Sequence, residues 1–209
     1  MNDNTHEIVK EIKKQFRLSM NGVVSTLQRR QGLEYKINFG IEIPRLKALA
    51  SRYAKNRELA DELWKDDIRE CKILAIYLLP EEEYFNVAEE WIASTRFTEI
   101  ADQLSMHILS RMPNAVEKAL KWTSIQKGLF SYCGYMTLSH LFRTGDSMKA
   151  QEEQLFVDNI ASLFASESSS TIRRCAYNAL LHYLEHDEKR EERIRAIAME
   201  KKHTDIPGL

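Results

Sequence analysis

Asp102 is the first residue of this chain whose type and surroundings could do chemistry. It lies between Ala101 and Leu104 inside an apolar-periodic run. A carboxylate in such a place is a candidate for a functional role. It can equally be a polar residue on the exposed face of a helix or make a capping contact, and the sequence leaves both interpretations open.

Aromatic residues accompany Asp102. Phe97 precedes it, and Phe130, Tyr132 and Tyr135 open the apolar run that follows the next tryptophan. Tyrosine suits a wall that is half apolar and half wet. These rings are therefore candidates for core packing or for contact with a bound nucleotide.

The cysteines and histidines favour structural roles. The three cysteines are odd in number and far apart, and we expect small buried residues in a reducing cytosol; they are Cys71, Cys133 and Cys175. Three histidines stand on expected helices without metal-ligand spacing; they are His107, His140 and His182. The chain has no phosphate loop, dinucleotide fingerprint or nucleophile elbow. We expect neither a metal nor a cofactor.

Charge argues against a generally basic surface. The formal net charge is −1 and the pI is near 6.6, so a nucleic-acid role needs a local basic patch. Basic residues stand near expected helix starts and loops. They would form a stripe if they converged on one face, and scattered solvated charge is the alternative. These residues are Arg29, Arg30, Arg45, Lys47, Arg52, Lys55, Lys118, Lys121, Lys127, Arg173 and Arg174.

A repeat positions these residues. Trp64, Trp91 and Trp122 each close a short amphipathic segment, and each is followed by a longer apolar-periodic run. Their spacing of about 30 residues is typical of a stacked helical repeat. The shared register predicts packing residues rather than a stacking platform. Such a stack builds a curved groove, lined here by the longer helices.

The expected fold class is all-α, with about ten helices and no strand. Gly and Pro number only 7 and 4, which favours helices over turn-rich β structure. One helix should cover residues 5–30, with Ile8, Ile12, Phe16 and Met20 on one face. Asn114 is the expected N-cap of the helix over residues 115–122. The other expected helices begin at Pro44 or cover 58–64, 68–79, 81–91, 98–112, 129–143, 147–165, 171–184 and part of 186–202.

We expect a single domain over residues 1–209, since the serines at 168–170 are too few to separate domains. No apolar run has membrane-spanning length, and the first residues are polar rather than a signal peptide. A cytoplasmic location follows from these features.

Residues 38–79 are the most specific part of the sequence. They read NFGIEIPRLKALASRYAKNRELADELWKDDIRECKILAIYLL. This segment resembles the HEAT-like-repeat DNA alkylation repair family, the AlkD-type alkylpurine DNA glycosylases. The matching elements are Phe39-Gly40, Ile43-Pro44, Leu46, Leu49-Ala50, Leu63-Trp64 and Arg69-Glu70. A second match is Ile172-Arg173-Arg174 followed by Ala179-Leu180, and together the resemblance covers roughly residues 36–183.

The resemblance implies a right-handed superhelix of HEAT-like repeats with a concave, positively charged face that holds double-stranded or branched DNA by its backbone. In active members an alkylated base is hydrolysed without being flipped into a pocket. A Trp, an Asp one turn later and an Arg from the next inner helix act together there. The carboxylate stabilises the cationic sugar as the glycosidic bond breaks.

These roles map only partly onto this chain. Asp102 matches the carboxylate, whereas Thr98 occupies the Trp position, with Phe97 beside it. The Arg position falls within residues 131–134, which contain no Arg. The resemblance thus implies a DNA-binding member whose glycosylase activity is weakened or lost. Alternatives are an active N-alkylpurine glycosylase with a rearranged site around Asp102, and a protein-binding helical scaffold. The candidate DNA-contacting residues are Thr98, Phe97, Tyr132, Tyr135, Arg45, Lys47, Arg173 and Arg174.

Overall fold

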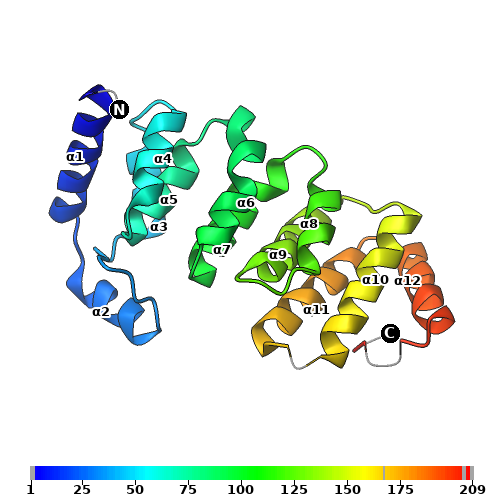
Figure 1. The fold of residues 1–209 in the computed structure, drawn as a ribbon. Coiled ribbons are helices and arrows are strands. Elements are labelled where there is room, and N and C mark those ends of the chain that lie inside the picture. Colours follow the sequence, from blue (N-terminus) through cyan, green and yellow to red (C-terminus); the bar gives the residue numbers. More distant parts are fainter. Residues whose placement is uncertain (1–2, 167, 204–205, 208–209) are drawn as a thin grey trace. The chain divides into compact units, whose positions relative to one another are not determined.

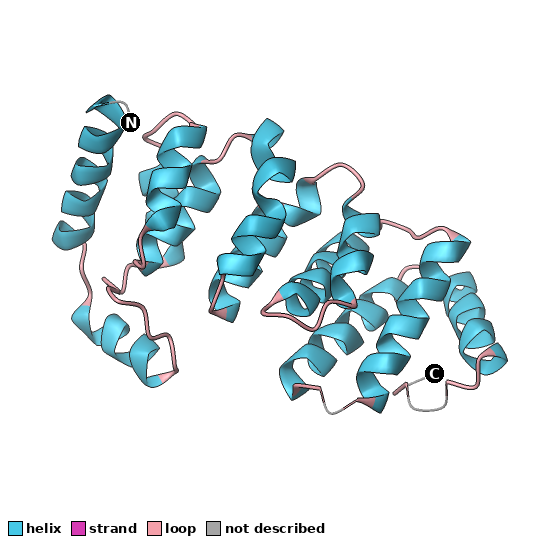
Figure 2. Ribbon diagram, in the orientation of Figure 1, coloured by secondary structure: helices cyan, strands magenta, loops and turns pink. Residues whose placement is uncertain are grey.

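The computed structural model describes residues 3–166, 168–203 and 206–207. Over these ranges the chain forms twelve α-helices and two short 3₁₀ helices, with no strand (Figures 1 and 2). One isolated parallel bridge joins Ile37 to Ile68. The all-α prediction is confirmed. None of the described helices is both long and apolar enough to cross a bilayer.

Two compact units divide the chain, Met1–Asn86 and Val87–Leu209, with the boundary inside α6. Unit 1 comprises α1 (Asp3–Leu18), α2 (Gly22–Arg30), α3 (Ile43–Ala50), α4 (Arg57–Lys65), α5 (Arg69–Leu78), η1 (Glu81–Glu83) and the start of α6 (Tyr84–Ser94). Unit 2 continues with α7 (Thr98–His107), η2 (Leu109–Arg111), α8 (Ala115–Thr123), α9 (Phe130–Arg143), α10 (Ala150–Ala165), α11 (Ser170–Leu184) and α12 (Glu188–Glu200). The single domain over residues 1–209 stays a prediction.

The helix predicted over residues 5–30 is two helices, so that prediction is wrong. Asn21 separates them. Its side chain caps α2 by accepting a hydrogen bond of 3.2 Å from the Val24 N–H, and its own N–H donates to the Phe39 carbonyl at 2.8 Å. Met20 is 63% exposed and does not belong to the buried face of α1. A side-chain cap and a long-range backbone bond therefore override the apolar periodicity.

A buried carboxylate holds the loop between α2 and α3. Glu70, in the first turn of α5, accepts hydrogen bonds from the N–H groups of Phe39 at 3.1 Å and Ile41 at 3.2 Å. The Arg69 guanidinium lies 3.2 Å from the same carboxylate and donates to the Ile41 carbonyl at 2.8 Å. Both side chains are almost fully buried. Because a buried charge is tolerated only when it is paired and hydrogen-bonded, these contacts tie the loop to α5.

Gly40 sits at the narrowest point of this loop. Its φ is +68°, a left-handed conformation that favours glycine. A Cβ there would lie 2.3 Å from the Asn21 carbonyl oxygen and 2.6 Å from the Ser25 nitrogen. No side chain fits in that space, so the loop can approach α2 only with glycine at this position.

The tryptophans are buried, which confirms the prediction that they pack. Trp64, Trp91 and Trp122 are at most 5% exposed and lie in α4, α6 and α8. The predicted contrast between short and long helices holds only for α8 and α9, with nine and fourteen residues. The expected helix over residues 98–112 ends at His107 and continues as η2.

Helix α9 is the centre of unit 2. Ten of its fourteen residues are buried, and it packs against α7, α8 and α11. Gly134 permits the close approach of α8, since a Cβ there would lie 2.8 Å from the Ala119 carbonyl oxygen. Helices α7 and α9, which follow Trp91 and Trp122, are neighbours as the repeat predicts.

Asn114 occupies the N-cap position of α8 as predicted, but its side chain makes no capping hydrogen bond. Its backbone is left-handed, with φ of 55°. An N-cap residue normally has an extended backbone that lets its side chain reach the first turn. The left-handed turn directs the chain into α8 without that contact.

Replacing Gly40 by alanine should destabilise the protein more than replacing Gly32. Both glycines have positive φ, but nothing lies within 4 Å of a Cβ at Gly32. We expect Gly32→Ala to cost about 1 kcal/mol through backbone strain alone. Gly40→Ala should cost at least about 2 kcal/mol, because it adds a clash with backbone atoms. Urea unfolding of both variants measures the difference, and equal losses would contradict the close approach.

Candidate functional site

Asp102 is paired with Tyr132. The Tyr132 hydroxyl, in the first turn of α9, donates a hydrogen bond of 2.7 Å to Oδ1 of Asp102 on α7. Asp102 is half-buried and Tyr132 is buried. Tyr132 lies within residues 131–134, the segment to which the resemblance assigns an Arg. The carboxylate therefore has a neutral donor at the position where a guanidinium was expected.

Burial raises the pKa of the Asp102 carboxyl above its usual value, while the hydrogen bond from Tyr132 opposes this rise and the Glu99 charge adds to it. Burial, and then the bond to Asp102, raises the pKa of Tyr132. The phenol thus remains a proton donor at neutral pH. Among the described residues, the main groups that shift the pKa of Asp102 are a phenol and a carboxylate, and this distinguishes the site from an ordinary ion pair.

Residues from the first two turns of three helices lie close together around this pair. Burial raises the pKa of the Cys175 thiol on α11 to about 11, and the nearby Asp102 charge adds to the rise. Further along the same helices, the Ser139 hydroxyl lies 2.8 Å from Nδ1 of His182. Since the early contacts join early residues and the late contact joins late ones, α9 and α11 run in the same direction. Their N-terminal ends lie together with the Asp102 side of α7.

Phe97 and Thr98 stand where α7 begins. Phe97 is half-buried and occupies the N-cap position, and the Arg96 guanidinium lies 5.3 Å from its ring centre. Thr98 is exposed. Residues four apart share one face of a helix, so Thr98 lies beside Asp102 on α7. Their predicted contact with DNA stays a prediction.

Tyr135 does not belong to this surface, and its predicted contact with DNA is wrong. Its side chain is fully buried within unit 2. Tyr132 and Tyr135 are separated by nearly one turn of α9, but only Tyr132 reaches the helix end where Asp102 lies. A ring enclosed by the core cannot meet a ligand at the surface.

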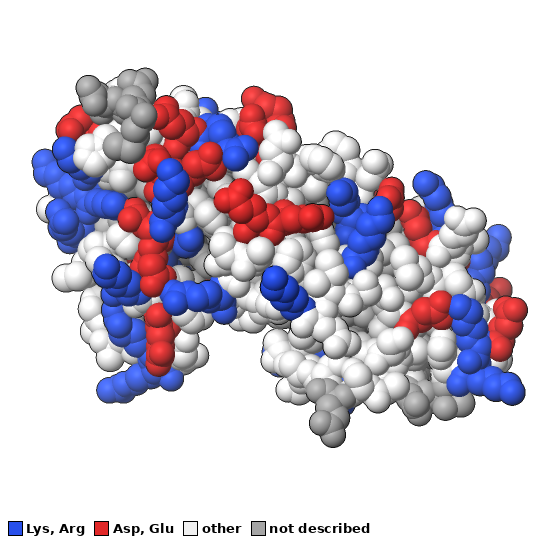
Figure 3. All heavy atoms as spheres, viewed as in Figure 1, with Lys and Arg blue, Asp and Glu red and all other residues white. Residues whose placement is uncertain are grey.

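The predicted basic residues fall in both units. Arg45 and Lys47 are exposed on α3 of unit 1, and Arg174 is exposed on α11 of unit 2. Arg173 is half-buried: its guanidinium donates to the Ser166 carbonyl and lies 5.9 Å from the Phe164 ring centre. Arg173 therefore anchors α11 to the end of α10. On the face drawn in Figure 3, cationic side chains gather over α1 and α2, with carboxylates between them.

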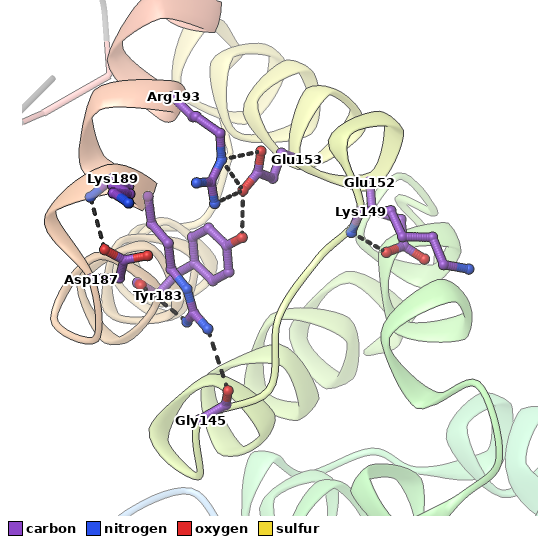
Figure 4. Close-up of polar contacts among 9 residues, drawn as sticks. Gly145, Lys149, Glu152, Glu153, Tyr183, Asp187, Lys189 and Arg193 are labelled. Atoms are coloured by element: carbon purple, nitrogen blue, oxygen red, sulfur yellow. Dashed lines mark hydrogen bonds and ion pairs between the residues drawn. The ribbon is translucent and has the colours of Figure 1, made fainter.

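A second buried carboxylate in unit 2 shows what a structural ion pair looks like here. Glu153 on α10 accepts from Tyr183 at 2.6 Å and from Arg193 at 2.7 Å (Figure 4). Burial alone would raise the pKa of Glu153, but the hydrogen bonds from Arg193 and Tyr183 outweigh it and lower that pKa. Glu153 and Asp102 each have a tyrosine partner, and only Glu153 has a cation. Their pKa values consequently shift in opposite directions.

The geometry of the described residues supports neither a cysteine nucleophile nor a metal site. All three cysteines are free and buried, as predicted. Burial raises the pKa of Cys133 to about 12, so its thiol is not a nucleophile at neutral pH. Within the described ranges no three His, Cys, Asp or Glu side chains are grouped to hold a metal ion.

Comparison with models of protein families shows which family the chain belongs to. Residues 11–203 match the model of the DNA alkylation repair enzyme family. The chain belongs to this family. Comparison with curated proteins gives no match. The match to the DNA alkylation repair enzyme family spans nearly all of both units, and it confirms the resemblance drawn from residues 38–79.

A solved structure shows the same fold. It is that of a new family of proteins related to the HEAT-like repeat DNA glycosylases with affinity for branched DNA structures. The two chains are 17% identical, the TM-score is 0.73, and the alignment covers 91% of this chain and 82% of the other. The HEAT-like repeat fold class is thereby confirmed for this member of the DNA alkylation repair enzyme family.

The role of Tyr132 was not visible in the sequence of this family member. Tyr132 was a candidate for DNA contact, but its hydrogen bond to Asp102 was not predicted. The sequence held one indication of this bond. Tyr132 lies in the segment that should contain the Arg, one repeat after Asp102, and its hydroxyl is a hydrogen-bond donor.

Removing the Tyr132 hydroxyl should raise the pKa of Asp102 further, because the hydrogen bond favours the ionised carboxylate. An NMR titration of the Asp102 carboxyl carbon in Tyr132→Phe measures this shift. Tyr177→Phe on α11 is the matched control, because that hydroxyl has no hydrogen bond in the described part of the chain. A pKa that stays unchanged or falls in Tyr132→Phe would sink the assignment.

The same shift should affect stability. Because the folded-state pKa of Asp102 is raised, the folded protein holds this proton more tightly than the unfolded chain does. The resulting stabilisation is present below the unfolded pKa and is lost as the pH rises through the folded pKa. Tyr132→Phe should therefore lose more stability than the wild type between acidic and neutral pH. Urea unfolding across this range tests the difference, and parallel pH profiles would contradict it.

Proposed function

We propose that the protein binds double-stranded or branched DNA and that its excision of alkylated bases is very slow or absent. The binding surface is the end of unit 2 where α7, α9 and α11 begin, around Asp102, Thr98 and Arg174. The observation that carries the proposal is the Asp102–Tyr132 pair. It leaves a matched carboxylate in a family of DNA repair proteins without a cationic partner.

Helix polarity supports binding of a phosphate backbone at this end. A helix N-terminus carries partial positive charge and free N–H groups. The first turns of α9 and α11 both lie there, and the exposed Arg174 adds a full charge. Contacts of this kind hold a backbone without reading its sequence. The solved relative has affinity for branched DNA structures, which supports the same class of ligand.

The residues around Asp102 are poorly suited to catalysing base excision. The resemblance assigns the catalytic work to a Trp, an Asp and an Arg acting together. Here Thr98 replaces the ring, and a neutral phenol replaces the guanidinium beside Asp102. The raised pKa of Asp102 also reduces its tendency to carry charge. A developing cationic sugar would meet one weakened carboxylate, to which a phenol rather than a guanidinium is hydrogen-bonded.

DNA affinity should fall steeply with salt, because backbone contacts release counterions. Arg174→Glu should weaken binding to different duplex sequences to a similar degree and lower the salt slope by about one or more. Lys189→Glu on α12, an exposed charge that follows the C-terminal end of α11 rather than its beginning, is the matched control. Fluorescence anisotropy of labelled duplex and branched DNA measures both. Absent binding at low salt would favour the protein-binding scaffold instead.

Release of free alkylated base from methylated DNA should be very slow or undetectable. Losing one preorganised electrostatic partner costs about a hundredfold or more in rate, and two are missing here. Wild type and Asp102→Asn should therefore behave alike. Robust release that Asp102→Asn abolishes would establish the rearranged active glycosylase and overturn this part of the proposal.

A further inference from the structure

Unit 1 contains a basic pocket that the proposed function does not use. Its volume is about 510 Å³, and segments far apart in sequence line it. Four cations and two carboxylates surround an apolar floor. The cations are Lys13, Arg17, Lys36 and Lys65; the carboxylates are Asp66 and Asp67; the floor is Ile37, Phe39 and Ile68. A surface of this composition can hold a ligand that is both anionic and apolar.

Two of the cations are available to a ligand. Lys13 is paired with Asp66 at 2.7 Å, and Lys65 is paired with Glu62. Arg17 and Lys36 are exposed, and in the part of the chain that the structure describes neither has an ion pair. Lys13 and Arg17 are four residues apart, so they share one face of α1. Arg17 and Lys36 can therefore neutralise phosphate charge at the rim.

The floor is rigid before any ligand arrives. The Phe39 N–H is held by Glu70, and its ring lies 5.6 Å from that of Phe16. Ile37 is bridged to Ile68 by backbone pairing, yet 39% of Ile37 is exposed. The exposed Ile37 side chain therefore presents an apolar surface on a paired backbone. Such preorganisation lowers the entropy lost on binding.

We propose that this pocket binds one nucleotide of an unpaired DNA strand. The phosphate lies against Arg17 and Lys36, and the base covers Ile37 and Phe39. Asp66 pairs with Lys13, and Asp67 accepts a hydrogen bond from the Lys36 N–H at 3.2 Å, so these carboxylates hold the pocket's own residues in place. A nucleotide combines a phosphate with a flat, largely apolar base face, which matches both parts of this lining. A paired base hides both its faces by stacking, so the partner is unpaired.

This inference rests on the proposed DNA binding but adds a second site, in unit 1, with a different strand preference. The site near Asp102 is expected to track a duplex backbone. The unit 1 pocket is expected to take strand ends or branch points, where bases are free. The two sites can therefore be tested separately with matched DNA probes.

The test uses the full chain and a labelled oligothymidylate of about ten nucleotides, compared with a duplex of equal length. Arg17→Glu and Lys36→Glu should each weaken oligothymidylate binding by roughly tenfold and lower its salt slope by about one. Lys14→Glu is the matched control, since it is exposed on α1 but does not line the pocket. Duplex binding should change no more in the pocket variants than in this control.

A floor variant separates base contact from charge. Ile37→Ala should weaken oligothymidylate binding by roughly fivefold and leave the salt slope unchanged, because no phosphate contact is lost. Circular dichroism and urea unfolding verify that each variant is folded. Thymidine monophosphate should compete weakly. Competition by the free nucleotide as strong as that of the oligonucleotide, or displacement by polyglutamate, would contradict an unpaired strand as the ligand.

The outcomes distinguish the two proposals. If the wild type binds duplex but not oligothymidylate, or if Arg17→Glu and Lys36→Glu match Lys14→Glu, the pocket inference is wrong and the proposed function stands. If the wild type binds neither probe at low salt, both are wrong.

Discussion

The buried Glu70 carboxylate is the interaction on which unit 1 depends. Its two oxygens accept the N–H groups of Phe39 and Ile41, and Arg69 neutralises its charge. Removing one member of a buried ion pair typically costs about 3–5 kcal/mol. Loss of this ion pair would destabilise the loop that carries Gly40. It would also weaken the packing of this loop on α2 and the position of Phe39 in the basic pocket. A single charged group thus fixes three local features.

This dependence explains which residues carried the family resemblance. Phe39-Gly40 and Arg69-Glu70 lie far apart in sequence but form one contact. They are constrained by sterics and by buried charge. A resemblance built on such residues identifies the fold firmly and says little about chemistry. Membership of the family and loss of its usual catalytic set are therefore compatible in one chain.

Unit 2 shows how one residue type serves two purposes. Glu153 and Asp102 are both carboxylates that accept a tyrosine hydroxyl. Arg193 makes Glu153 a stable ion pair with a lowered pKa, whereas Asp102 lacks a cation and has a raised pKa. A carboxylate kept half-buried without a cation costs stability, and such groups cluster at functional sites. The contrast supports a surface role for Asp102 and a structural role for Glu153.

Sequence periodicity predicted most helices, because burial of an apolar face controls where a helix packs. It missed the break at Asn21, since that break depends on a bond to Phe39 in a distant loop. It also grouped Arg173 with Arg174, although only the former reaches back to Ser166. Asp102 was found from its apolar context and the resemblance. The hydrogen bond between Asp102 and Tyr132 and the basic pocket were missed, because each requires side chains from separate segments to meet.

We expect DNA to lie against the beginnings of α7, α9 and α11 in unit 2. An NMR titration of the isotope-labelled protein with a short duplex tests it most directly. We expect the largest amide chemical-shift changes at Thr98, Asp102 and Arg174. These changes should be smaller at high salt than at low salt. Shifts confined to other helices, with these three signals unmoved at saturating duplex, would contradict it.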